Sequence, residues 1–530
     1  MNNLQKNIKI IFFIFCIMFL SLMSYLTFFQ LYERQRLIES SYNKRLWEQE
    51  AKIKRGAILD RNGIILAETV EVGGEKKRIY ISGEAFGPLL GYSSSKIGRS
   101  GLESALNGEL LGISQQDPLK VLRQKIFGLS QGNNVYLTID SELQKKVYSL
   151  LQGKKGAVVA IEPKTGAVLA MVSSPGFDSN KIEEEWEKLK NDDNHPLLNR
   201  AIQGLYPPGS AFKVLTLCGA LENFAGIEKE RFTTKGYIKI GGRIIKDDDF
   251  IKPGQYDLKR AFAVSSNAIF AELGLRLGRD RLLKVANNFG FNSEIPFELH
   301  VQKSQFPGPS FLDSDVQLAE DSIGQGKVLA TPLQMASVAQ IIANDGVYYS
   351  PYIVKSVEMP FGEIKSKDFG ALRKVVILPN TAYKLKEYMT EVVESGTGRA
   401  AKIKGIRVAG KTGTAENPHG EPHAWFIGFA PVEAPKIAIA VIVENGGSGG
   451  RVAAPLAREL ILEYLKEKNR FKGWSENEKK PYSRWHSFTS NNGVGVKFCC
   501  NEKCVFKSNS FYVFSSEIFN CFPYSCGYFQ

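Results

Sequence analysis

The feature that most constrains this chain is a run of 20 residues, Ile10 to Phe29, without a single charged side chain. A helix of about 20 residues spans roughly 30 Å, the thickness of the hydrocarbon core of a bilayer. The run is longer than the apolar part of a secretory signal, and no small-residue cleavage pattern closes it. The sequence therefore predicts a transmembrane helix, with a cleaved signal peptide as the alternative.

Basic residues around this run predict its orientation. Lys6 and Lys9 precede it, and cytoplasmic flanks of membrane helices carry an excess of Lys and Arg. Arg34 and Arg36 on the other flank weaken the preference. Because no later stretch is long and apolar enough to span a bilayer, we expect a single-pass protein of the cell membrane, with its catalytic domain on the extracytoplasmic side.

Charge and cysteine usage narrow the partners and the compartment. The 530 residues carry a formal net charge of +13, which suits anionic surfaces such as phospholipid headgroups, wall polymers or nucleic acid. The sequence has no zinc-finger spacing, Walker loop or RNA-binding aromatic motif, so we expect no nucleic acid partner. Cys218 is the only cysteine between residues 31 and 470, which excludes a disulfide scaffold for the main body.

Short apolar runs bracket a middle section with helical patterning. Residues 55–67 and 156–174 each predict a β-hairpin, because apolar stretches flank a glycine-containing turn. Residues 68–100 look like loops, and residues 206–345 look mostly helical. Three strand-like runs follow within residues 407–444. We expect an α+β fold in which the second hairpin and these three strands form one antiparallel sheet.

Shifts in composition divide the chain into four parts. They are a cytoplasmic end with the membrane anchor (1–30), an N-terminal pedestal or stalk module (31–155), a catalytic domain (156–469) and an atypical tail (470–530). The tail is rich in Cys, Phe and Ser and lacks periodicity, so we expect a disordered or irregular appendage. Its origin as a real extension or a reading-frame change stays open.

A serine stands three residues before a lysine at Ser210 and Lys213, after Tyr-Pro-Pro-Gly and before an apolar run. If a helix begins at Ser210, both side chains lie on one face. A desolvated lysine loses its proton more readily and can then activate the serine hydroxyl. The alternative is a simple helix N-cap. The same spacing recurs at Ser93 and Lys96, where a Gly/Ser-rich context favours a structural role.

Two further patterns follow in order. Ser265 and Asn267 can face one site from a loop, the hydroxyl relaying a proton and the carboxamide holding a substrate amide. A later strand begins with a lysine, two hydroxyls and a glycine that admits close approach of a ligand: Lys411, Thr412, Gly413 and Thr414. A second Lys-Thr-Gly, at residues 164–166, is explained by the turn of its hairpin.

The ordered set S-x-x-K, S-x-N and K-T-G is a signature of penicillin-binding proteins and serine β-lactamases. With it the sequence resembles a class B penicillin-binding protein, and the segment before the catalytic domain resembles the PbpA-type subgroup. Other blocks extend the resemblance over about residues 10–466: RGAILDRNGIILA, NRAIQGLYPPGSAFK, SIGQG, ATPLQMA, GTGRAA, GKTGTAE and AWFIGFAP.

The resemblance implies a peptidoglycan D,D-transpeptidase with a serine β-lactamase-like domain, inhibited by β-lactams. Ser210 would be acylated by the penultimate D-alanine of a D-Ala-D-Ala stem peptide, with Lys213 as its base. Ser265 would return the proton to the leaving D-alanine. The other implied roles are donor-peptide binding by Asn267, positive potential from Lys411, substrate binding by Thr412, Gly413 and Thr414, and an oxyanion hole from the N–H groups of Ser210 and Thr414.

The resemblance also implies no cofactor and no metal, and a SEDS-type glycan polymerase as a partner in the membrane. None of the five histidines stands beside a candidate serine, which argues against a Ser-His-Asp triad. Residues 31–155 lack the acidic blocks expected of a glycan polymerase domain. Two alternatives stay open: a membrane-anchored β-lactamase or β-lactam sensor, and a catalytically inactive scaffold of wall synthesis.

Overall fold

The structure is a computed structural model that forms two units, Met1–Lys466 and Glu467–Gln530. It describes residues 2–29, 47, 50–81, 83–112, 131–309, 314–360, 362, 364–366, 372–418, 420–477, 488–489 and 495–496. In the second unit, β20 (Phe488–Thr489) pairs antiparallel with β21 (Gly495–Val496). The cysteines of the predicted tail lie outside the described residues.

Helix α1 (Asn2–Phe28) contains almost all of the uncharged run. Within the described part of the chain, it is the one helix long and apolar enough to cross a membrane. Its apolar side chains are exposed, as a lipid-facing helix requires.

A six-stranded sheet is assembled from two distant parts of the chain. Its order is β15-β14-β6-β1-β2-β3. Its strands are β1 (Ile58–Leu59), β2 (Ile65–Val72), β3 (Glu75–Tyr80), β6 (Asn134–Leu137), β14 (Val354–Glu358) and β15 (Ile364–Ser366). The antiparallel β1–β2 pair is the predicted first hairpin, with Gly63 at φ +85° in its turn.

The expectation of loops over residues 68–100 is wrong. Strand β2 continues to Val72, and β3 pairs with it along its whole length. Strand β3 has no apolar alternation, because it is an edge strand whose first residues face solvent. Short elements follow it: η2 (Gly83–Ala85), α4 (Gly87–Leu90), β4 (Ser93–Ser94), β5 (Gly98–Arg99), α5 (Gly101–Ala105) and α6 (Asn107–Leu111).

The predicted antiparallel sheet is present, with strand order β17-β18-β19-β7-β8. Its strands are β7 (Gly156–Ile161), β8 (Val168–Ser174), β17 (Ala409–Ala415), β18 (His423–Ala430) and β19 (Ile437–Val443). Every residue of β7, β8 and β19 is buried, so both faces of the sheet are covered. Uninterrupted apolar runs are what such doubly covered strands require.

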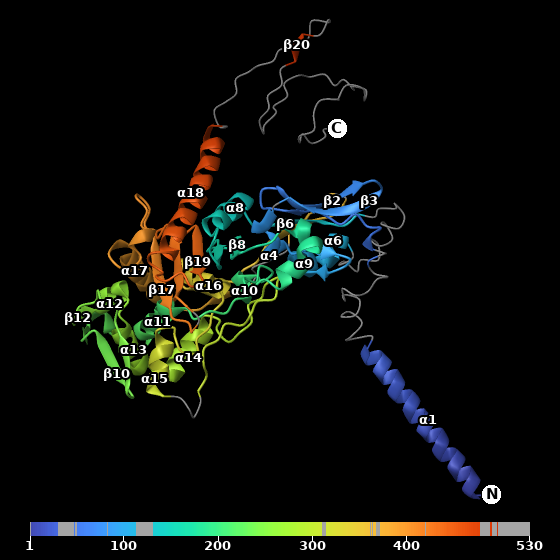
Figure 1. Ribbon diagram of the computed structural model, residues 1–530, viewed down its shortest axis with the longest axis horizontal. Coiled ribbons are helices and arrows are strands. Elements are labelled where there is room, and N and C mark those ends of the chain that lie inside the picture. Colours follow the sequence, from blue (N-terminus) through green and yellow to red (C-terminus); the bar gives the residue numbers. More distant parts are fainter. Residues whose placement is uncertain are drawn as a thin grey trace, which may run out of the picture. The chain divides into compact units, whose positions relative to one another are not determined.

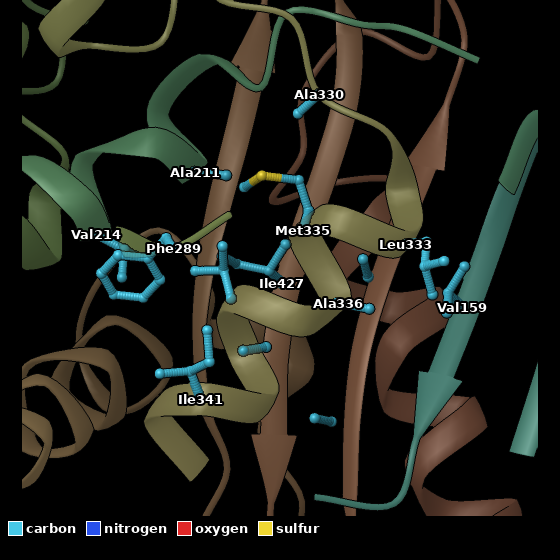
Figure 2. Close-up of a cluster of buried hydrophobic side chains, with 14 of the residues drawn as sticks. Val159, Ala211, Val214, Phe289, Ala330, Leu333, Met335, Ala336, Ile341 and Ile427 are labelled. Atoms are coloured by element: carbon cyan, nitrogen blue, oxygen red, sulfur yellow. The ribbon is translucent and has the colours of Figure 1, made fainter. Parts of the chain in front are cut away.

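Helices cover the two faces of this sheet (Figure 1). On one face, α8 (Ser141–Leu150) and the start of α18 (Ala453–Asn477) form a core with the strands. On the other face lies α16 (Pro332–Ala343), all of whose residues are buried. Figure 2 shows Leu333 and Met335 of α16 among the side chains of Val159 from β7 and Ile427 from β18.

The section between residues 206 and 345 holds the predicted helices but also four strands that the sequence did not reveal. Two antiparallel pairs form, β9 with β12 and β10 with β11. Their bounds are β9 (Arg231–Thr234), β10 (Tyr237–Ile240), β11 (Arg243–Lys246) and β12 (Gly254–Asp257). Each strand has only four residues, too few for a distinct period of burial.

The remaining elements complete the helical part and its surroundings. The helices are α9 (Ile182–Lys190), α10 (Arg200–Gln203), α11 (Lys213–Asn223), α12 (Leu258–Val264), α13 (Asn267–Leu277), α14 (Arg279–Asn288), α15 (Asp315–Ser322) and α17 (Pro379–Glu394). The 3-10 turns are η3 (Ser179–Lys181), η4 (Gly209–Phe212), η5 (Ile227–Lys229) and η6 (Arg399–Ala401). Strand β13 (Val347–Tyr349) pairs with β16 (Arg373–Val375).

Candidate active site

The candidate nucleophile Ser210 lies on the 3-10 turn η4, which leads directly into α11. The helix proper therefore begins at Lys213, three residues later than predicted. Gly209 has φ +52°, and a Cβ there would lie 2.6 Å from the carbonyl oxygen of Thr414, so only glycine permits this turn so close to β17. The Gly209 N–H donates to the Gly324 carbonyl at 2.9 Å, which fixes the turn from the opposite side.

The Ser210 side chain is half-buried and lines a cavity of about 940 Å³. Its hydroxyl makes no hydrogen bond to any described residue. A hydroxyl that faces a cavity without a partner is available to an incoming carbonyl group.

Lys213 is fully buried at the start of α11. Its Nζ donates to the Ser265 carbonyl at 2.7 Å, to Asn267 Oδ1 at 2.7 Å and to Ser265 Oγ at 3.3 Å. Burial lowers the pKa of Lys213 to about 7, while the charges of Asp247 and Asp248 act in the opposite direction. A large fraction of this lysine is therefore neutral near pH 7, as a base must be.

Ser265, Ser266 and Asn267 form the turn between α12 and α13. Ser265 is in the left-handed region, with φ +66° and ψ +40°. Ser266 caps α13, its Oγ accepting the N–H of Ile269 at 3.2 Å. Asn267 is the first residue of α13, and its Nδ2 donates to the Lys246 carbonyl at 2.8 Å. Because of this turn, Ser265 and Asn267 both contact Lys213.

Lys411, the third residue of β17, is also fully buried. Its Nζ donates to Ser265 Oγ at 2.9 Å and to the Thr412 carbonyl at 3.0 Å. Burial, and then the charge of Lys213, hold the pKa of Lys411 well below its usual range. Two lysines from separate elements thus share the single hydroxyl of Ser265.

The rest of the K-T-G-T segment follows along β17, an edge strand of the five-stranded sheet. Thr412 Oγ1 lies 2.6 Å from Thr397 Oγ1, and Thr414 Oγ1 accepts the N–H of Gly449 at 3.3 Å. A Cβ at Gly413 would lie 2.6 Å from the Pro208 carbonyl, so glycine here lets the turn before Ser210 approach the strand.

The cavity gathers the residues that the three motifs single out. Ser210, Ser265, Asn267, Thr412 and Thr414 all line it, and Lys213 and Lys411 lie buried behind Ser265. No histidine is among the residues that line it. In the described part of the chain, no cluster of three His, Cys, Asp or Glu residues could hold a metal ion.

The duplicate motifs lie elsewhere. Ser93 is in β4, where its Oγ accepts Arg99 Nε at 3.2 Å, and Lys96 pairs with Glu183 at 2.9 Å. Lys164 is exposed in the turn between β7 and β8. None of these residues lines the cavity.

Several residues that support the site have no motif of their own. Asp247 accepts hydrogen bonds from Ser266 Oγ and the Ala268 N–H, both at 2.9 Å. Trp425 Nε1 donates to the Pro207 carbonyl at 2.9 Å, which holds the turn before Ser210. Nothing in the sequence distinguishes Asp247 from the two aspartates that follow it, whereas Trp425 stands in the AWFIGFAP block.

Comparison with known families agrees with this geometry. The penicillin binding protein transpeptidase domain matches residues 156–462, and the penicillin binding protein A dimerisation domain matches residues 55–135. The peptidoglycan D,D-transpeptidase PbpA of Mycolicibacterium smegmatis is 37% identical over 459 residues, which are 80% of this chain and 92% of that protein. PbpA of Mycobacterium tuberculosis is 35% identical over 466 residues, 82% of this chain and 94% of that protein.

Solved structures give the same result. The penicillin G acyl-enzyme complex of penicillin-binding protein A from M. tuberculosis has a TM-score of 0.72 and 35% identity, covering 78% of this chain and 100% of that chain. A D,D-transpeptidase domain from Eggerthella lenta also gives 0.72 and 35%, covering 79% and 99%. The α+β fold and the resemblance to PbpA-type proteins are confirmed, and the chain belongs to the penicillin-binding protein transpeptidase family.

Proposed function

We propose that this protein is a peptidoglycan D,D-transpeptidase that cross-links stem peptides through an acyl-enzyme on Ser210 and that β-lactams inhibit it. The observation that carries the proposal is one cavity lined by Ser210, Ser265 and Asn267, in which two buried lysines donate to the turn that holds Ser265. The names of the relatives and the acyl-enzyme complexes of a related protein support the same chemistry.

Acylation begins with the neutral form of Lys213. Its Nζ takes the Ser210 proton as Ser210 Oγ attacks the carbonyl carbon of the penultimate D-alanine of a D-Ala-D-Ala stem. The N–H groups of Ser210 and Thr414 stabilise the negative oxygen of the tetrahedral intermediate. When the C–N bond breaks, the hydroxyl of Ser265 passes a proton to the leaving D-alanine, and a lysine that donates to Ser265 replaces it.

The second half-reaction transfers the acyl group to an amine of a neighbouring stem. That amine attacks the ester carbonyl, its proton returns through the same groups, and Ser210 is released. Because Ser265 contacts both lysines, it can serve as the proton path in both halves.

Recognition of the donor falls to Asn267 and to β17. Asn267 binds the amide of the donor peptide, while Thr412, Gly413 and Thr414 present the edge strand to its terminal carboxylate. Lys411 lies directly behind these residues. An arriving carboxylate favours the charged form of Lys411, so the lysine becomes cationic when the substrate needs it.

The proposal includes the organisation of the chain. Residues 1–30 anchor it, 31–155 form a pedestal, 156–469 are the catalytic domain on the extracytoplasmic side, and 470–530 are an appendage. The apolar helix α1 and the two matched domain families support this division. A SEDS-type glycan polymerase in the same membrane would supply the strands that are cross-linked.

Covalent labelling tests the nucleophile. Ser210→Ala should abolish labelling by a fluorescent penicillin without unfolding the protein, since the half-buried Ser210 hydroxyl caps neither η4 nor α11. Ser93→Ala is the matched control, and it should label like the unaltered protein. An acyl group that mass spectrometry locates on any residue other than Ser210 would refute the mechanism. Rapid nitrocefin turnover would instead favour a β-lactamase.

A topology experiment tests the anchor. A reporter that is active only outside the cytoplasm should be active when fused after residue 60, because Lys6 and Lys9, which precede the uncharged run within α1, keep the N-terminus inside. A mature N-terminus near residue 30 would show that a signal peptide had been removed.

A further inference from the structure

Asp247 is a buried carboxylate that directly follows β11, and its two neighbours, Asp248 and Asp249, are exposed. Its Oδ1 accepts Ser266 Oγ and the Ala268 N–H, both at 2.9 Å, and its Oδ2 accepts Thr234 Oγ1 at 2.7 Å. The Asp247 carboxylate is only 8% exposed and accepts three hydrogen bonds, so its position in the structure is specific.

These bonds tie the S-x-N turn to the β10–β11 hairpin. Asp247 holds the side chain of Ser266 and the first turn of α13, while the preceding carbonyl, of Lys246, accepts Asn267 Nδ2 at 2.8 Å. Ser266, the residue next to Ser265, is therefore held both through its side chain and through the first turn of α13. Since Ser265 is in the left-handed region, which is costly for a non-glycine residue, its conformation depends on such external support.

The same carboxylate influences Lys213 through its charge. The charged groups that face Lys213 are Asp247 and Asp248, which favour its protonated form, and Lys411, which donates to the same Ser265 hydroxyl. Burial pulls the pKa of Lys213 down, and Asp247 limits that fall. Replacing Asp247 by a neutral residue should therefore lower the pKa of the base further.

We propose that Asp247 is a positioning residue of this active site: it fixes the Ser265–Asn267 turn against β11 and sets the charge balance around Lys213. The proposal rests on the proposed function, because it assigns the carboxylate a role in the acylation of Ser210. Two substitutions of Asp247 should therefore separate the effect of its hydrogen bonds from the effect of its charge.

The experiment measures the second-order rate of acylation of the full-length protein by benzylpenicillin from pH 5 to 9. The rate should rise with pH as Lys213 loses its proton and then reach a plateau. Asp247→Asn keeps an acceptor for Ser266 and Ala268, and its amide can donate to the Thr234 hydroxyl, which in the unaltered protein donates to the carboxylate. The plateau should therefore stay within about threefold, while the midpoint moves down by about 0.5–1 pH unit. Asp247→Ala should show the same shift and a plateau about tenfold lower or less.

Asp249→Asn is the matched control: the same change on an exposed residue outside the cavity lining should move neither midpoint nor plateau. If Asp247→Ala does not fold, Ser266→Ala replaces it, and it should lower the plateau without moving the midpoint. An unchanged midpoint in Asp247→Asn, or an equal shift in Asp249→Asn, overturns the proposal. Failure of the unaltered protein to acylate at Ser210 would instead overturn the proposed function.

Discussion

The left-handed backbone of Ser265 is a conformation that glycine adopts freely and serine adopts at a cost of about 1 kcal/mol or more. Ser265 nevertheless presents a hydroxyl to which both buried lysines donate. We predict that Ser265→Gly leaves the melting temperature unchanged or raised, while penicillin acylation falls about 10²-fold or more through loss of the proton path. A variant that is both stabilised and fully active would show that the hydroxyl is not used.

The two lysines of the Lys-Thr-Gly repeats provide a second prediction at this scale. Lys411→Ala removes a donor from Ser265 and the charge behind β17, so acylation should fall about 10²-fold. Lys164→Ala changes an exposed turn and should acylate at the normal rate. The measurement is the rate of fluorescent penicillin labelling for each variant, and equal small effects would refute the assignment of Lys411.

At the residue scale, the order of the motifs in the sequence was sufficient to identify the candidate catalytic residues. It did not identify the residues that hold them in place. The three motifs predicted Ser210, Lys213, Ser265, Asn267 and Lys411. In the structure Ser210, Ser265 and Asn267 line one cavity, and the two lysines lie buried behind Ser265, although the roles of all five remain proposals. The contacts of Asp247 could not be predicted, because they depend on its burial after β11, which Asp248 and Asp249 do not share.

At the scale of elements, the central sheet was predictable because β7 and β19 are continuous apolar runs and β8 begins with five apolar residues, a pattern typical of a doubly covered sheet. Strands β9 to β12 were not predictable. Each has four residues, and cross-strand pairing rather than a distinct period holds them in place. The misplaced helix start has a related cause, since proline and glycine marked the turn η4 but not its 3-10 geometry.

One ion pair connects elements that meet next to the nucleophile. Arg200 of α10 is 2% exposed, and its Nε donates at 2.7 Å to Glu444, which follows β19 and also accepts Tyr206 Oη at 2.7 Å. We predict that Glu444→Ala, which leaves the buried guanidinium with only the His195 and Asn194 carbonyls and no carboxylate, destabilises the fold by about 3 kcal/mol. Urea denaturation measures this.

A double variant supplies the control for that prediction. Arg200→Met together with Glu444→Gln removes both charges, so its loss of stability should be clearly smaller than that of Glu444→Ala alone. If both lose the same stability, the ion pair contributes no more than packing.

At the scale of the whole molecule, the predicted boundary at residue 155 does not separate two independent sheets. Strands β14 and β15 come from the later part of the chain, yet β14 pairs with β6 in the N-terminal sheet. Asp60 in the first hairpin accepts Ser141 Oγ at 2.8 Å at the start of α8, which packs on the catalytic sheet. A linear reading of composition cannot reveal such pairing, because the partner strands are far apart in the sequence.

This shared sheet leads to a prediction about cooperativity. A chain of residues 156–466 would lose β6, the partner of β14, and α8 from the face of the catalytic sheet. It should therefore melt well below the full-length protein, expose an unpaired edge and aggregate.

Truncation after residue 477 is the matched control, since the described core ends at Tyr464, and it should preserve both melting temperature and penicillin acylation. Calorimetry should show one transition for residues 50–466 in the truncated protein. Two separate transitions, or an isolated 156–466 fragment as stable as the longer chain, would mean that the N-terminal module and the catalytic domain fold independently despite sharing a sheet.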